Sequence, residues 1–78
     1  MSSRSIALEH ALERHEGDVQ AAVLDLAGLG RNALADKIHV DAKVLSRTLA
    51  GSVPGLHVRR ALEQELGLGA YELDRWLP

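Results

Sequence analysis

The sequence predicts an all-α fold of five to six short helices, forming a single domain over residues 1–78. Apolar residues recur at spacings of three and four, as they do along one face of a helix. Alanine and leucine are abundant while β-branched residues are scattered, which favours helices over strands. Glycines and prolines separate the periodic segments and keep each helix short. Because the chain has no cysteine, side-chain packing must hold this fold together without disulfides or thiolate-bound zinc.

The N-terminal part carries two amphipathic segments. An extra N-terminal helix is expected within residues 1–16, with its pattern clearest over residues 5–15. Its apolar residues are Ile6, Leu8, Ala11 and Leu12. The second helix follows Asp18, a good N-cap, and ends before Gly28. Its expected inner face is Val19, Ala22, Val23 and Leu26.

Residues 31–51 carry two helical patterns joined by a tight turn. The first pattern begins near Arg31 and ends at about Ile38, and the second follows the N-cap candidate Asp41 and stops at Gly51. The expected inner face of the pair is Leu34, Ala35, Ile38, Val40, Leu45 and Leu49. The opposite face of the second helix carries Ala42, Lys43, Ser46 and Arg47. Two helices of this kind predict a helix-turn-helix.

Residues 56–77 are expected to form the C-terminal helices, after a Pro-Gly turn. The first has Gly67 at its end, and its expected inner residues are Val58, Ala61, Leu62 and Leu66. A short last helix over residues 71–77 would place Leu73, Trp76 and Leu77 on one side. Trp76 is interpreted as a core residue, with a dimer contact as the alternative.

The charges are unevenly distributed along the chain. Residues 31–60 hold six basic and two acidic residues, a net charge of +4, while the remainder holds three basic and nine acidic residues, a net charge of −6. An acidic protein can therefore still present a positive surface to a phosphate backbone. The alternative is a solvated charge pattern without a partner.

The outward polar residues of the 31–51 segment are those that a major-groove reader needs. Arg47 and Lys43 would contact bases or phosphates, and Ser46 would contact a base or simply be a small surface residue. Arg31, at a helix start, would contact phosphate. Arg59 and Arg60 would reach the flanking DNA backbone or, alternatively, pair with Glu63. Each cation could also be an ordinary surface residue.

The segment LADKIHV–DAKVLSRTLAG resembles the lambda-repressor and Cro family of helix-turn-helix proteins, in its order of aliphatic, alanine, turn and aliphatic-serine positions. The downstream VRRALEQELGLGAYELDRWLP is similar to the last two helices of such domains, so the resemblance covers about residues 18–78. It implies a DNA-binding domain whose residues 42–47 enter the major groove. One departure is His39, which stands where the family usually has glycine in a left-handed turn.

A second resemblance overlaps the first. The stretch ALERHEGDVQAAVLDLAGLGRNALADKI is similar to the C-terminal helix-turn-helix of the factor-for-inversion-stimulation family. That register implies that DNA faces Arg31, Asn32, Ala35 and Asp36. The spacing from Gly17 to Gly28 is one residue too long for it, so the first register is preferred and the second stays open.

The sequence does not indicate an enzyme. Its four histidines lack metal-ligand spacing, and it has neither a phosphate-binding glycine loop nor a nucleophile turn. We expect no cofactor, metal or small-molecule ligand. No apolar run has the roughly 18–20 residues of a membrane span, and the N-terminal residues lack the apolar core of a secretion signal, so a cytoplasmic location away from membranes is expected.

These observations predict a sequence-specific transcriptional regulator, a phage or bacterial repressor that binds double-stranded DNA as a homodimer on a palindromic site. The alternative is a protein-interaction module on the same scaffold, which binds a polymerase, a repressor or a toxin. The acidic residues outside the central segment favour that alternative.

Overall fold

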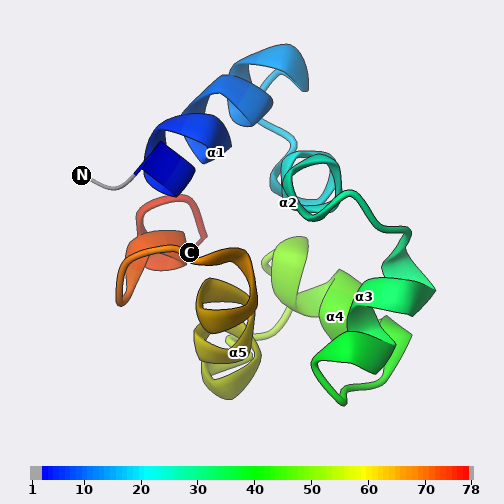
Figure 1. Ribbon diagram of the computed structural model, residues 1–78. Helices are drawn as coiled ribbons and strands as arrows, with labels where there is room; N and C mark the ends of the chain where they lie inside the picture. The colour runs from blue at the N-terminus through cyan, green and yellow to red at the C-terminus, as the bar shows by residue number, and fades with distance from the viewer. Residues whose placement is uncertain (1–2, 78) are drawn as a thin grey trace.

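A computed structural model describes residues 3–77 and confirms the all-α fold class. Helices, the 3-10 turn included, account for 68% of the described residues, among which no strand occurs. The elements in order are α1 (Ser3–Arg14), α2 (Val19–Ala27), α3 (Arg31–Lys37), α4 (Ala42–Leu49), α5 (Leu56–Leu66) and the 3-10 turn η1 (Glu72–Arg75). Figure 1 shows α1 beside α2, with α3, α4 and α5 following below them. The C-terminal segment returns from α5 towards α1.

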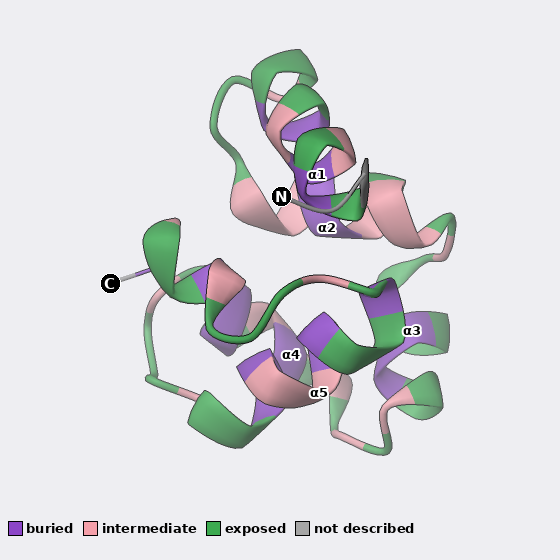
Figure 2. Cartoon of the chain, turned by 60° about the vertical axis from the view of Figure 1, so that its left-hand side comes forward, coloured by how far each residue is buried: buried purple, intermediate pink, exposed green. Residues whose placement is uncertain are grey.

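One core joins all these elements. Leucines from five of them are at most 1% exposed, and a valine from α2 is fully buried with them. These residues are Leu8, Val23, Leu34, Leu45, Leu62 and Leu73. Figure 2 shows the buried stretches on the sides where the helices face one another. The apolar spacing therefore identified the core-forming face of each of these helices.

The inner faces differ from the sequence expectation in several places. Five of the expected inner residues are half-buried at the margin of the core, namely Val19, Leu26, Ile38, Val40 and Trp76. Ile6 is 45% exposed, whereas Ser5 is buried. Successive helix residues are about 100° apart, so Ile6 lies on the far side of α1 from Leu8. On α5, Ala61 is only half-buried, because Arg59 and Glu63 occupy buried positions beside the leucines.

The helix boundaries follow local signals. The Asp18 carboxylate accepts a hydrogen bond from the Ala21 N–H at 3.1 Å, and Asp41 accepts one from the Lys43 N–H at 2.7 Å, so both expected N-caps form. Gly28 ends α2 in the left-handed conformation at φ 68°. The C-terminal residues form the 3-10 turn η1 in place of the expected short helix. The start of η1 is held by hydrogen bonds from the backbone N–H groups of Tyr71 and Leu73 to the Glu63 carboxylate of α5.

Candidate nucleic-acid interface

The turn between α3 and α4 contains a residue in the left-handed conformation. His39 adopts φ 60°, the left-handed conformation that glycine adopts most easily. The His39 N–H donates to Asp36 O at 3.1 Å, and the Val40 N–H donates to Ala35 O at 3.0 Å. This pair of bonds is a Schellman motif, which ends α3 abruptly and redirects the chain. Asp41 then caps α4.

Helix α4 has a sharply divided surface. Leu45, Thr48 and Leu49 are buried against the core, so the residues between them face outward. Lys43 and Arg47, one turn apart, are both exposed. Ser46 is half-buried and Val44 is 36% exposed, whereas Ala42, which the sequence predicted on the outward face, is half-buried and packs against the core. The exposed strip of α4 thus combines two cations with small or short side chains.

Ion pairing separates the cations of this strip from those elsewhere. Of the nine lysines and arginines, five have a carboxylate partner within 4 Å in the described residues. The paired cations are Arg14, Lys37, Arg59, Arg60 and Arg75. The four others are Arg4, Arg31, Lys43 and Arg47. Arg4 donates to the backbone carbonyl oxygens of Leu26 and Leu66. In the described residues, the cations bound neither to a carboxylate nor to a backbone carbonyl therefore all belong to α3 and α4.

A small polar cluster connects the starts of α2 and α3 to α4. The Arg31 guanidinium donates to Ser46 Oγ at 3.2 Å, and Gln20 Nε2 approaches the same oxygen at 3.5 Å. Ser46 therefore lies at the meeting point of three helices. Sequence reasoning missed Gln20. Its position in the first turn of α2 was visible, but its proximity to Ser46, 26 residues later, was not.

Asn32 follows Arg31 on α3 and is also exposed. Its side chain forms no hydrogen bond within the described part of the chain. Ala35, which the second register turns towards DNA, is instead 2% exposed and belongs to the core. The residues that this register requires are therefore divided between the surface and the interior.

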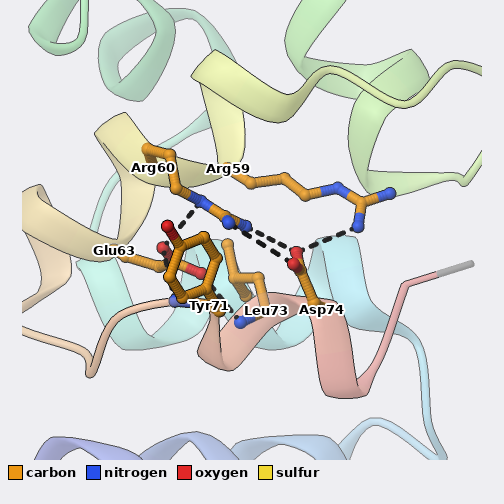
Figure 3. Close-up of polar contacts among 6 residues, drawn as sticks. All are labelled: Arg59, Arg60, Glu63, Tyr71, Leu73 and Asp74. Atoms are coloured by element: carbon orange, nitrogen blue, oxygen red, sulfur yellow. Dashed lines mark hydrogen bonds and ion pairs between the residues drawn. The ribbon is translucent and has the colours of Figure 1, made fainter.

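Arg59 and Arg60 lie in an ionic cluster between α5 and η1 (Figure 3). Arg59 is 4% exposed and binds Asp74 at 3.1 Å, while Arg60 binds both Asp74 and Glu63. Hydrogen bonds from Arg60 and Arg59 lower the pKa of Asp74 below its usual value. Of the two roles considered for these arginines, the structure contains the internal one, including the expected Arg60–Glu63 pair.

Glu63 completes this cluster. Although it is only 3% exposed, its carboxylate accepts hydrogen bonds from the backbone N–H groups of Tyr71 and Leu73, at 3.2 and 3.0 Å. The Arg60 guanidinium also lies 4.5 Å from the centre of the Tyr71 ring (Figure 3). A buried carboxylate must be compensated in this way. The cluster therefore holds the C-terminal turn in place and leaves neither arginine extended towards solvent.

The described residues contain no group of three or more His, Cys, Asp or Glu residues arranged to hold a metal ion. None of the helices in that part of the chain is long and apolar enough to cross a bilayer. Comparisons of the chain with protein-family models, with curated proteins and with solved structures find no match.

Proposed function

We propose that the protein binds double-stranded DNA in a sequence-specific manner, as a transcriptional regulator, with α4 in the major groove. One observation carries this proposal. Within residues 3–77, the cations of α3 and α4 that could face a phosphate backbone, Arg31, Lys43 and Arg47, have no carboxylate partner, whereas five of the other six cations do. Such cations are available to replace counterions along the duplex.

The outward strip of α4 suits the dimensions and chemistry of the groove. Its side chains between the two cations are small, so the helix backbone can approach the base edges. Arg47 would donate to a guanine edge, and the exposed methyl groups of Val44 would contact a thymine methyl. Arg31, already oriented by Ser46, would contact the phosphate backbone beside α4. Arg59 and Arg60 are not part of this proposed interface, because both are engaged with Asp74.

Burial of Ala35 supports the α3–α4 register over the alternative one. In the alternative, α3 would be the reading helix, and Ala35 would need to face the bases. In the preferred register the same alanine belongs to the inner face of α3, where its burial is expected. Asn32 remains the residue that distinguishes the two registers, because it is exposed in either case.

We further propose that the protein acts as a homodimer on a palindromic operator and represses by occluding a promoter. Two copies of α4 related by a two-fold axis would read half-sites about 34 Å apart. This spacing would appear as a repeat of about one helical turn in the selected DNA sequences.

Selection from a random double-stranded DNA library, followed by anisotropy titration of the enriched site, tests the proposal. We expect Arg47→Ala to weaken binding by 1–3 kcal/mol, or about 5- to 150-fold, and to relax specificity at one position of each half-site. Arg14→Ala is the matched control, because Arg14 is exposed but paired with Asp25 on another part of the surface. Loss on Asn32→Ala, with Arg47→Ala unchanged, would transfer reading to α3. Absence of enrichment at low salt would reject DNA binding.

A second candidate function is protein binding on the same scaffold. The observation that favours it is the excess of acidic residues outside residues 31–60. Salt-tolerant binding to a protein, in place of salt-sensitive binding to DNA, would distinguish this function from the first.

A further inference from the structure

A groove of about 460 Å³ runs along α1, apart from the elements proposed to contact DNA. Its lining residues come from α1, from the turn after α1 and from the residue that follows η1. They are Glu9, Leu12, Glu13, Glu16, Gly17 and Trp76. None of them belongs to α3 or α4. Figure 1 shows α1 and the C-terminal segment on one side of the molecule and α3 on the other.

The groove is apolar inside and acidic at its edge. Leu12 and the half-buried Trp76 provide the apolar surface. Glu13 and Glu16 are exposed and have no ion pair within residues 3–77. Glu9 differs, because Arg75 lies 3.5 Å from its carboxylate and partly neutralises it. The edge of the groove therefore carries two uncompensated negative charges.

Glu9 and Glu13 are four residues apart and lie on the same side of α1, one turn apart. Glu16 follows in the turn after α1, where its φ is 55°. The acidic residues of the groove thus extend from α1 into the turn that follows it.

We propose that this groove docks a segment of a partner protein in which an apolar anchor residue is flanked by lysine or arginine. The anchor would pack on Leu12 and Trp76, and the flanking cations would pair with Glu13 and Glu16. Charge complementarity selects this partner: an acidic or neutral segment would leave both carboxylates uncompensated. The inference is independent of DNA binding, because the two surfaces share no residue.

The groove has a built-in reporter, because Trp76 is the only tryptophan of the chain. The probe is a tryptophan-free synthetic peptide of about twelve residues, with leucines spaced four apart and lysines between them. We expect saturable binding in anisotropy, together with a change in Trp76 emission over the same concentration range. A peptide with the lysines replaced by glutamates, and one with the leucines replaced by serines, should each bind at least about tenfold more weakly.

Charge reversal locates the site. Glu13→Lys should weaken binding of the lysine peptide by about fivefold or more, because it replaces attraction by repulsion at the edge of the groove. Asp36→Lys is the matched control, since it makes the same charge change at an exposed position on α3. Glu13 lies in the last turn of α1, where a lysine is compatible with the helix dipole, so the variant should fold, as circular dichroism will check.

Three outcomes would overturn the proposal. An equal loss in Glu13→Lys and Asp36→Lys would reduce the effect to net charge. Peptide binding that leaves Trp76 emission unchanged would place the peptide elsewhere. Sedimentation that shows self-association, abolished by Glu13→Lys, would assign the groove to a second copy of this chain. None of these results changes the DNA titrations. If the groove binds no peptide, the proposal of DNA binding is still decided by the DNA titrations alone.

Discussion

At the scale of single residues, His39 is where amino-acid identity and backbone geometry conflict. Its φ of 60° is unfavourable for any residue with a Cβ atom, although the two Schellman hydrogen bonds around it require that conformation. The imidazole forms no hydrogen bond or ion pair with the rest of the described chain. The turn therefore tolerates histidine without depending on its ring.

We expect His39→Gly to stabilise the protein by about 1 kcal/mol, because glycine relieves the strain of the left-handed residue and loses only part of this gain to chain entropy. Urea unfolding followed by circular dichroism measures the change. His10→Gly is the control at an exposed position inside α1, where the same substitution should destabilise by about 0.5–1 kcal/mol. Destabilisation by His39→Gly would mean that the ring contributes a contact in solution.

At the scale of elements, α4 depends on Asp41 for its start. The Asp41 carboxylate accepts a hydrogen bond from the Lys43 N–H, and no other side chain in the described part of the chain caps this helix. The same carboxylate lies beside the proposed DNA-reading strip, so Asp41 has opposite effects on folding and on phosphate attraction.

Asp41→Ala should lower the free energy of unfolding by about 1 kcal/mol, since it leaves the first turn of α4 without its cap. Asp41→Asn keeps a capping oxygen and should remain within about 0.5 kcal/mol of the wild type. If α4 contacts DNA, Asp41→Asn should also tighten binding at low salt, because it removes a negative charge near the phosphates. Thermal unfolding and anisotropy titration on the two variants test both effects. Equal destabilisation by both substitutions would contradict the capping role.

At the scale of the whole molecule, the cluster between α5 and the C-terminal turn makes stability depend on pH. The pKa of Asp74 is lowered chiefly by hydrogen bonds from Arg60 and then from Arg59. The pKa of Asp25 is lowered by its hydrogen bonds with Arg14 and then His15. A carboxyl group with a lowered folded-state pKa stabilises the protein fully above its unfolded pKa of about 3.9, and this contribution is lost as pH falls through the folded pKa.

We therefore expect the stability of the wild type to fall with pH below about pH 4, and Asp74→Asn to show a smaller fall while being less stable at pH 7. Urea unfolding at several pH values measures this difference. Asp36→Asn is the control, because Asp36 is exposed and has no ion pair in the described residues. Parallel pH profiles for the wild type and Asp74→Asn would contradict the assigned role of Asp74.

The proposed DNA complex makes a further prediction about the molecule as a whole. Each phosphate neutralised by a cation contributes about 0.9 to the slope of log affinity against log salt concentration. Arg31→Ala should thus lower that slope by about 1 and weaken binding to all sequences similarly, as expected for a backbone contact. Arg75→Ala, whose cation is paired with Glu9, should leave the slope unchanged. A change of sequence preference in Arg31→Ala would instead indicate a base contact.

The sequence by itself determined the features whose signals are local. Apolar spacing predicted the helices, and Asp18 and Asp41 predicted two helix starts. These features depend on residues at most a few positions apart, where the helical period and the cap chemistry act directly. The outward position of Lys43 and Arg47 follows from the same period.

Tertiary structure alone decided which distant groups meet. The sequence offered Arg59 and Arg60 either DNA or Glu63, and it did not indicate Asp74, fourteen or fifteen residues away, which binds both. It likewise gave no sign that Ser46 lies beside Arg31 and Gln20, or that Trp76 lies against the acidic side of α1. Such meetings depend on how helices pack around a shared core. Packing angles and distances are set by the fit of many side chains at once, which no local pattern contains.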